Sequence, residues 1–430
     1  MTLLKRAAEG NGIVAKGLRY LGASIGPVSS AVAQFLLWMI LLHQLDQSAF
    51  GAFSLLLIAS QLAGALWSAL FCAPLPIMFN ASSGAEREQL LACLFSSNLL
   101  LALGSTLLFW AMAAALAVTT LAAILFALFA GISLLRWFAR AHAYVSGEPM
   151  RTILSDSVYA TVLMIGVGLC LAVPHASLLI AYGAMLGGAA LGLLPFGTRY
   201  LKRQFADFSA SPIRDYGAIW KRHSGWSLTG VVTVEATANA HAYIVTALLG
   251  PTAFAPLAAS SLVTRPIGVA LNALAEFERA QMARFIGDGQ IAEARAALRY
   301  FQLTMFAAWL LVMATCGILL WVAPHLLFPR QYKLQLLVIG AALWMLIALV
   351  RLWRTPVSTL MQAAGAFRPL AIASVYSAIV SVVAVIALLL MKGPLWSLVG
   401  VLSGELTFAG AAWLAYHRWL AERRPVGLTE

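Results

Sequence analysis

Long apolar segments follow one another through almost the whole chain, and this feature limits the fold more than any other. About twelve segments of roughly 18 or more mostly apolar residues lie between residues 20 and 416. No stretch between them is long enough to form a separate soluble domain. Because backbone groups inside a bilayer must find partners within the protein, we expect each segment to be an α-helix. The sequence therefore predicts an all-α polytopic membrane protein.

A basic linker at residues 199–223 separates the expected spans into two groups of six. We therefore predict an N-terminal six-helix bundle over residues 1–198 and a C-terminal six-helix bundle over residues 224–430. The expected spans cover residues 20–43, 50–79, 90–116, 119–137, 152–173, 177–196, 224–249, 254–275, 301–322, 334–363, 371–391 and 395–416.

The positions of the rare charged residues predict the orientation of the chain. Charged residues make up only 10% of the sequence, far below the roughly 25% of a soluble domain. Lys and Arg gather in the two tails and in the loops after even-numbered spans, whereas the opposite loops hold only Arg330, Lys333 and Lys392. Because positive residues stay on the cytoplasmic side, we expect both termini to be cytoplasmic. The net charge of +12 then reflects membrane topology, and we expect no nucleic-acid partner.

The sequence contains no motif for catalysis, cofactor binding or metal binding. It has no Gly-rich phosphate loop, no paired acidic DxxD motif and no spacing that supports a Ser-His-Asp arrangement. The four cysteines share no close spacing, so neither a metal site nor a disulfide framework is expected. The expected outer loops are too short for a catalytic domain. We therefore expect a membrane transporter without a cofactor, and no catalytic or metal-binding residues.

Arginines within the spans are the first candidates for a functional site, since each costs about 2.5–3.5 kcal/mol at the centre of a membrane helix. Arg265 lies near the middle of the eighth span, and Arg351 and Arg354 share one helix face in the tenth. Arg can donate two parallel hydrogen bonds to phosphate oxygens, so these residues predict a cavity that binds an anionic group. Arg136 and Arg140 end the fourth span, where we expect their long side chains to extend to the cytoplasmic interface.

Acidic and polar residues in the same half complete the candidate site. Glu235 is central in the seventh span, Asn239 lies one turn further on, and His241 follows; Glu405 is central in the twelfth span. We predict that Asn239 and His241 line the cavity and that Glu235 or Glu405 takes part in proton or cation coupling. The alternative is structural ion pairing within the protein, for example between Arg265 and Glu235.

Two short segments occupy matching places in the two halves. Residues 45–51 read LDQSAFG and residues 249–255 read LGPTAFA, each directly after the first span of its half. The first looks like the small loop before a Gly-aromatic helix start in Wzx-type polysaccharide flippases. Residues 264–271, TRPIGVAL, look like the eighth-helix segment of lipid II flippases. In these features and in its layout the chain resembles the multidrug/oligosaccharidyl-lipid/polysaccharide (MOP) exporter superfamily, and within it the Wzx-type flippases.

The resemblance implies two pseudo-symmetric six-helix bundles around a central cavity, a MATE-like architecture that works by alternating access. It implies a flippase that carries a polyprenyl-pyrophosphate-linked oligosaccharide across the bacterial inner membrane for exopolysaccharide or O-antigen assembly. Arg265 is the one residue whose role is carried over by position. Expected partners are the lipid-linked oligosaccharide, membrane lipids and other polysaccharide-assembly proteins. The alternatives are a cation-coupled small-molecule exporter of the MATE type and a membrane-embedded polysaccharide polymerase or ligase.

Overall fold

The computed structural model describes residues 13–422, which consist of helices and the turns between them. The chain separates into two compact units. Within the described residues, unit 1 comprises residues 13–45 and Leu56–Val231, and unit 2 comprises Asp46–Leu55 and residues 232–422. The basic tail residues that lie outside the described residues are Lys5, Arg6, Arg423 and Arg424.

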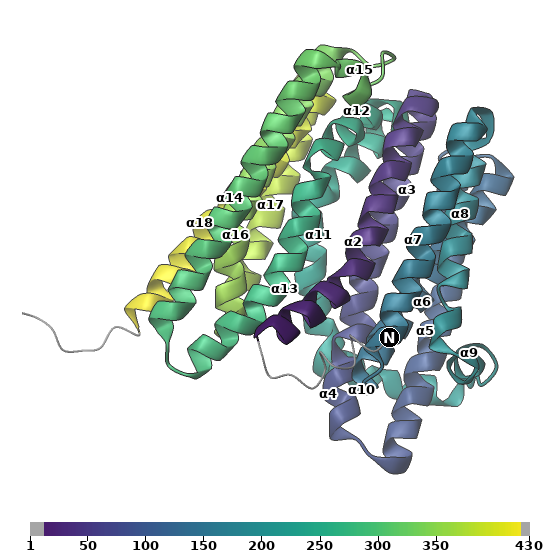
Figure 1. Cartoon of the computed structure of the whole chain (residues 1–430), viewed down its shortest axis with the longest axis vertical. Helices are drawn as coiled ribbons and strands as arrows, with labels where there is room; N and C mark the ends of the chain where they lie inside the picture. The colour runs from purple at the N-terminus through teal and green to yellow at the C-terminus, as the bar shows by residue number, and fades with distance from the viewer. Residues whose placement is uncertain (1–12, 423–430) are drawn as a thin grey trace, which may run out of the picture. The chain divides into compact units, whose positions relative to one another are not determined.

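Unit 1 combines long apolar helices with several short ones (Figure 1). Its elements are α2 (Ile13–Gln44), the larger part of α3 (Gln47–Trp67), the π-helical turn η1 (Ser68–Cys72), α4 (Pro74–Ala81), α5 (Gly84–Ala115), α6 (Thr120–Val145), α7 (Pro149–Ala172), α8 (Ser177–Leu191), α9 (Thr198–Phe205), α10 (Tyr216–Ile219) and the π-helical turn η5 (Trp220–Ser224). Helix α2 packs against α7, α5 packs against α6, and α8 packs against both α6 and α7.

The expected linker after the sixth span folds back onto unit 1. The Asn98 side chain is fully buried; its Oδ1 accepts a hydrogen bond of 2.7 Å from Trp67 Nε1, and its Nδ2 donates one of 2.9 Å to Gln204 Oε1. Tyr216 donates a hydrogen bond of 2.9 Å to the carbonyl oxygen of Leu70. Since buried polar groups need such partners, these bonds fix α9 and α10 in place. The linker segment is a packed part of unit 1.

Unit 2 holds the candidate site. Its elements are the start of α3, most of α11 (Gly225–Leu249), α12 (Pro251–Ser261), the 3₁₀ turn η6 (Leu262–Thr264), α13 (Arg265–Gly287), α14 (Ile291–Val322), α15 (Pro324–Leu327), α16 (Leu334–Ala363), α17 (Phe367–Lys392) and α18 (Ser397–Ala421). Helix α16 packs against α12, α13, α14 and α18 (Figure 1). Side chains of α16 therefore contact four other helices of unit 2.

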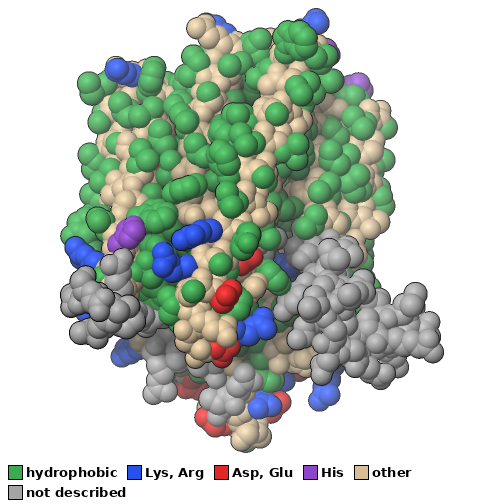
Figure 2. All heavy atoms as spheres, turned by 60° about the vertical axis from the view of Figure 1, so that its left-hand side comes forward, with side chains coloured by type: hydrophobic (Ala, Val, Ile, Leu, Met, Phe, Trp, Pro, Cys, Tyr) green, Lys and Arg blue, Asp and Glu red, His purple; other side chains and the backbone are tan. Residues whose placement is uncertain are grey.

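The outer surfaces of the long helices suit a lipid environment. Ten helices of the described residues are long and apolar enough to cross a membrane, and the shorter Val28–Gln44 stretch of α2 is also apolar. On α14, the large side chains of Leu311 and Trp321 are 69% and 87% exposed. Hydrophobic side chains cover most of the face seen in Figure 2, and charged side chains gather toward its lower end. The prediction of an all-α, multi-span membrane protein is confirmed.

Helices α17 and α18 approach each other closely at two glycines. A Cβ atom on Gly400 would lie 2.4 Å from the backbone nitrogen of Val385, and one on Gly404 would lie 2.5 Å from Ser381 Cβ. Real Cβ atoms do not tolerate such contacts, and a packed backbone cannot move aside cheaply. Small residues at such positions allow the backbones of two membrane helices to approach closely.

We expect Gly400→Ala to lower the free energy of unfolding by about 1–3 kcal/mol, the usual cost of overpacking a tight contact. Gly410→Ala on the same helix is the matched control, because a Cβ there meets nothing within 4 Å. The control should stabilise slightly, since Ala is the better helix former by about 1 kcal/mol. Thermal unfolding of the detergent-purified variants measures both. Equal melting temperatures would contradict the packing described here.

Candidate functional site

Two arginines of α16 share one buried carboxylate of α18. Arg351 Nε donates a hydrogen bond of 2.6 Å to one oxygen of Glu405, and Arg354 Nε donates one of 2.6 Å to the other. Glu405 has no exposed surface. The two arginines are one helical turn apart, so both side chains leave α16 on the same face. We call Arg351, Arg354 and Glu405 the C-terminal triad.

Taken by themselves, the three residues of the C-terminal triad carry a net charge of one positive unit, because both guanidinium groups stay protonated. Glu235 lies outside the triad, but its charge also acts on Arg351. The guanidinium of Arg354 also lies over the ring of Phe408, 4.5 Å from its centroid, which favours the cation. Nη2 of Arg351 is buried and has no hydrogen-bond partner among the described residues. A buried donor without an acceptor is costly. This nitrogen is therefore the atom of the triad best placed to receive another anionic oxygen.

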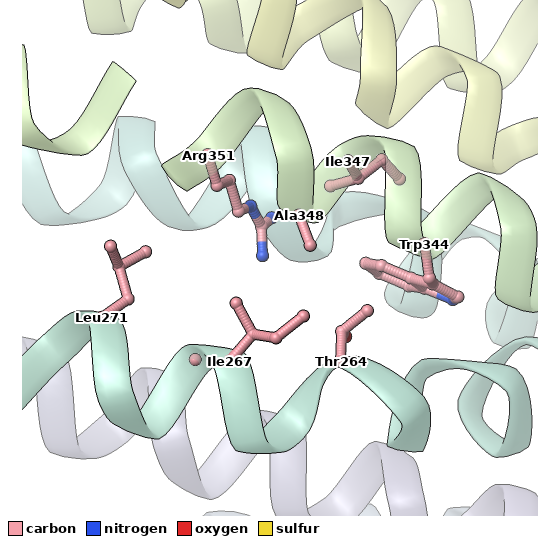
Figure 3. Close-up of a pocket in the computed structure, with 8 residues that line it drawn as sticks. Thr264, Ile267, Leu271, Trp344, Ile347, Ala348 and Arg351 are labelled. Carbon is pink, nitrogen blue, oxygen red and sulfur yellow. The ribbon is translucent and has the colours of Figure 1, made fainter. Parts of the chain in front are cut away.

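Arg351 lines a small cavity between α13 and α16. Figure 3 shows its guanidinium directed from α16 into the space beside Ile267 of α13. The cavity volume is about 50 Å³, and one water needs about 10–15 Å³. The cavity therefore has room for a few waters or one small anionic group, but not for a sugar. The lining residues are Thr264, Ile267, Gly268, Leu271, Trp344, Ile347, Ala348 and Arg351.

The eighth predicted span is not one continuous α-helix. Its two parts, α12 and α13, are joined by the 3₁₀ turn η6, and Arg265 is the first residue of α13. Pro266 has no N–H group, so the regular helical hydrogen bonding is interrupted there. The Arg265 side chain is half-buried, and the preceding residue, Thr264, lines the cavity. The break thus places the start of α13 at the cavity wall.

The three candidates on α11 lie in two separate environments. Asn239 Nδ2 donates a hydrogen bond of 2.6 Å to Glu235 Oε1, so these two side chains form a pair. His241 is buried, and its ring lies 5.4 Å from that of Trp344, which lines the cavity. His241 therefore packs against Trp344 of the cavity wall and does not itself line the cavity. The structure brings Arg351 together with Arg354 and Glu405. Glu235 also lies close enough for its charge to interact with that of Arg351.

A ladder of hydroxyl groups ties α11 to α17 and α18. Thr237 Oγ1 and Ser377 Oγ are 3.0 Å apart, and Ser381 Oγ donates a hydrogen bond of 3.0 Å to the carbonyl oxygen of Thr237. Ser377 Oγ also donates 2.8 Å to the carbonyl oxygen of Gly404, the residue before Glu405. This ladder fixes the backbone that presents Glu405. Hydropathy and charge alone did not predict this ladder, although hydroxyl residues spaced one turn apart within a span are a usable signal.

A second triad lies in unit 1 and was also missed. Asp156 of α7 is buried, and its carboxylate oxygens lie 2.5 Å from Arg136 Nη2 and 3.0 Å from Arg140 Nη2. The guanidinium of Arg136 lies over the ring of Tyr159. The expectation that Arg136 extends to the membrane interface is wrong, because a buried carboxylate holds it inside. Both arginine pairs stand in matching places of the two predicted halves, on the fourth and tenth spans.

Comparison with known proteins identifies the architecture. No protein-family model and no curated protein matches the sequence. The structure is similar to an inward-facing multidrug resistance MATE family transporter of the MOP superfamily, with a TM-score of 0.72 and 14% identity over 94% of this chain and 100% of that one. The fold is MATE-like. The predicted fold class is therefore confirmed.

Two further solved structures share this fold. The lipid II flippase MurJ in an inward closed conformation has a TM-score of 0.63 and 13% identity, over 91% of this chain and 87% of that one. A eukaryotic MATE transporter has a TM-score of 0.62 and 15% identity, over 98% of this chain and 99% of that one. The MOP fold is thus common to drug exporters and a lipid flippase. The finer resemblance to Wzx-type flippases stays a prediction.

Proposed function

We propose that this chain is a flippase that carries a polyprenyl-pyrophosphate-linked oligosaccharide across the bacterial inner membrane by alternating access, for exopolysaccharide or O-antigen assembly. The excess positive charge of the C-terminal triad, at the wall of a cavity, is the observation that carries the proposal. Pyrophosphate is anionic, and Arg is the side chain that best matches its oxygens. The lipid II flippase among the structural neighbours gives further support.

Glu405 acts in this proposal as the counter-ion of the empty site. It compensates Arg351 and Arg354 while no substrate is bound. An arriving pyrophosphate adds acceptors for Arg351 Nη2 and competes with the carboxylate for the same donors. When the substrate leaves, Glu405 pairs with both arginines again, so neither partly buried arginine is left without an anion. The site can therefore bind and release a charged head group at modest cost.

The sugar needs more room than the cavity offers. At about 50 Å³ the cavity accepts a phosphate-sized group only. Transport in this proposal therefore requires α13 and α16 to separate, and the break at Pro266 gives α13 a point at which to move. Arg265, at the start of α13, would then approach the substrate. Glu235, held by Asn239, remains our candidate for proton or cation coupling.

The second candidate function is cation-coupled export of a small molecule, because several of the similar structures are MATE transporters. A site for organic cations should carry excess negative charge, whereas the three residues of the C-terminal triad by themselves carry one excess positive charge. This difference makes the flippase the better-supported proposal and also provides the test.

The test compares binding of three probes to the purified protein in lipid nanodiscs. Undecaprenyl pyrophosphate supplies lipid and charge, undecaprenol supplies lipid alone, and tetraphenylphosphonium is an organic cation. We expect undecaprenyl pyrophosphate to bind at least about tenfold more tightly than undecaprenol, a difference of about 1.4 kcal/mol in binding free energy. Tetraphenylphosphonium should not compete with the pyrophosphate for binding. Competition by the cation together with equal binding of the two lipids would favour the exporter.

The proposed location has its own test. We propose that both termini and the linker at residues 199–223 are cytoplasmic, as the Lys and Arg distribution predicts. Single cysteines at the exposed positions Ser48 and Ala210, in a chain without its native cysteines, should then react differently. A membrane-impermeant maleimide added to intact cells should label position 48 and spare position 210. Labelling of position 210 before lysis would reverse the proposed orientation.

A further inference from the structure

Unit 1 contains a pocket of its own, between helix α5 and the folded-back linker. Its volume is about 380 Å³, and small-molecule sites have volumes of roughly 300–1,000 Å³. Helix α5 contributes Glu86, Gln89, Leu90 and Cys93 to the lining. Their spacing of i, i+3, i+4 and i+7 places all four on one face of the helix. The pocket is therefore built on a single helix face that the linker covers.

The walls of this pocket are largely apolar and are held in place by the linker. Leu90, Cys93 and Ile219 of α10 are buried where they line it. Asp215, the last residue of the 3₁₀ turn η4 (Ser211–Asp215), lines the pocket from the linker side. Gln89 Nε2 donates a hydrogen bond of 3.1 Å to Asp215 Oδ2 and so connects the two sides. The pocket is thus formed without a ligand.

The pocket carries two carboxylates that have no cationic partner. Glu86 and Asp215 are exposed, and neither forms an ion pair with another of the described residues. The arginines near them in the sequence or on the linker have other partners. Arg87 Nε and Nη2 both donate to one backbone carbonyl oxygen, and Arg203 pairs with Glu88 at 2.6 Å. Two negative charges beside an apolar wall are therefore left for a ligand.

We propose that this pocket binds a primary ammonium group carried on a short apolar chain. An ammonium group has three N–H donors, which Glu86 and Asp215 can accept, while Met78, Leu90 and Ile219 contact the chain. A hydrated metal ion would gain nothing from apolar walls, so an organic cation fits better. A free diamine and the head group of phosphatidylethanolamine both supply this chemistry. The proposal goes beyond the transported substrate, because the pocket lies in unit 1 and shares no residue with the C-terminal triad.

The first experiment tests the charge of the ligand. The full chain is placed in nanodiscs of phosphatidylcholine and phosphatidylglycerol, and 1,5-diaminopentane, pentanol and pentanoate are titrated by microscale thermophoresis. Only the diamine should bind. Glu86→Gln together with Asp215→Asn should weaken its binding by about tenfold, the order of effect expected for two exposed ion pairs. Glu88→Gln is the matched control, because Glu88 lies on the same helix but does not line the pocket, and it should keep the affinity of the unmodified chain.

The second experiment tests the space and the source of the ligand. Ala218→Trp fills the pocket from α10 without changing a charge, so binding of the diamine should be lost while the melting temperature is kept. In nanodiscs that also contain phosphatidylethanolamine, native mass spectrometry shows whether this lipid stays bound. Retention by the unmodified chain, with loss in both pocket variants and displacement by the diamine, would assign the site to the lipid head group. Diamine binding without lipid retention would assign it to a soluble amine.

Three results would overturn the proposal. They are the absence of binding of both the diamine and the lipid, equal affinity of the unmodified chain and the Glu86→Gln, Asp215→Asn variant, and diamine binding that survives Ala218→Trp. None of these measurements depends on flipping, so failure of this proposal and failure of the proposed function can be told apart.

Discussion

Glu405→Ala is expected to lower the free energy of unfolding by about 3 kcal/mol, the low end for a buried ion pair. Two arginines lose their shared, fully buried counter-ion, but their own side chains are 30% and 17% exposed. Glu405 is completely buried, and both of its oxygens accept charged hydrogen bonds of 2.6 Å. Among the described residues, Glu405 is the carboxylate that forms ion pairs with Arg351 and Arg354, while Glu235 acts on Arg351 only from a longer distance. The loss should appear as low abundance in the membrane and a reduced melting temperature in detergent.

Two further variants separate charge from packing. Glu422→Ala, at the exposed end of α18, should change stability by less than about 0.5 kcal/mol. Removing all three charges of the C-terminal triad, as Arg351→Met, Arg354→Met and Glu405→Leu together, should restore most of the stability, since apolar side chains of similar volume can replace a buried ion network. The triple variant should still fail to bind pyrophosphate. A stable single Glu405→Ala variant would show that the triad is not a buried ion pair.

Arg351→Ala is expected to weaken binding of undecaprenyl pyrophosphate by about 10- to 100-fold while leaving the protein abundant. A hydrogen bond to a charged group contributes about 1.5–3 kcal/mol, which corresponds to that change in affinity. Abundance should persist because Arg354 still pairs with Glu405. This combination differs from the effect of Glu405→Ala, where stability is lost first.

The control for this prediction is Arg368→Ala, which removes an equal charge from an exposed position of α17. Its affinity for the pyrophosphate should equal that of the unmodified chain. Arg351→Lys keeps the charge but loses the second parallel hydrogen bond, so its affinity should fall between the two. Binding unaffected by Arg351→Ala, measured by native mass spectrometry in nanodiscs, would assign the C-terminal triad a structural role only.

Hydropathy predicted the helices well because it depends on residues that are close in sequence. It underestimated their lengths where charged residues continue a helix beyond the membrane. Helix α14 begins at Ile291, whereas the apolar run begins at residue 301. Helix α13 likewise continues to Gly287, past the expected end at residue 275. An apolar window detects the part of a helix that lipid surrounds, and Ala, Glu and Arg extend the same helix into water.

The candidate site could be predicted only as a set of charges. Each charged residue within a span needs a reason, so Arg351, Arg354 and Glu405 could be selected from the sequence. Their pairing could not, because the tenth and twelfth spans become neighbours only through tertiary packing. Asp156 was not predicted as a site residue because it lies close to the end of its expected span. A charged side chain there can reach water and does not require a partner within the protein. Its burial depends on Arg136 reaching inward, which periodicity does not encode.

Flipping in proteoliposomes tests the central proposal most directly. A fluorescent undecaprenyl-pyrophosphate-linked oligosaccharide is placed in both leaflets, and the dye in the outer leaflet is bleached by an impermeant reductant. With the unmodified protein, bleaching should continue to nearly all of the dye, whereas vesicles containing the triple Arg351→Met, Arg354→Met and Glu405→Leu variant should stop at about half. Bleaching that stops at half with both proteins, or that continues equally with both, would contradict a flippase that works through this triad.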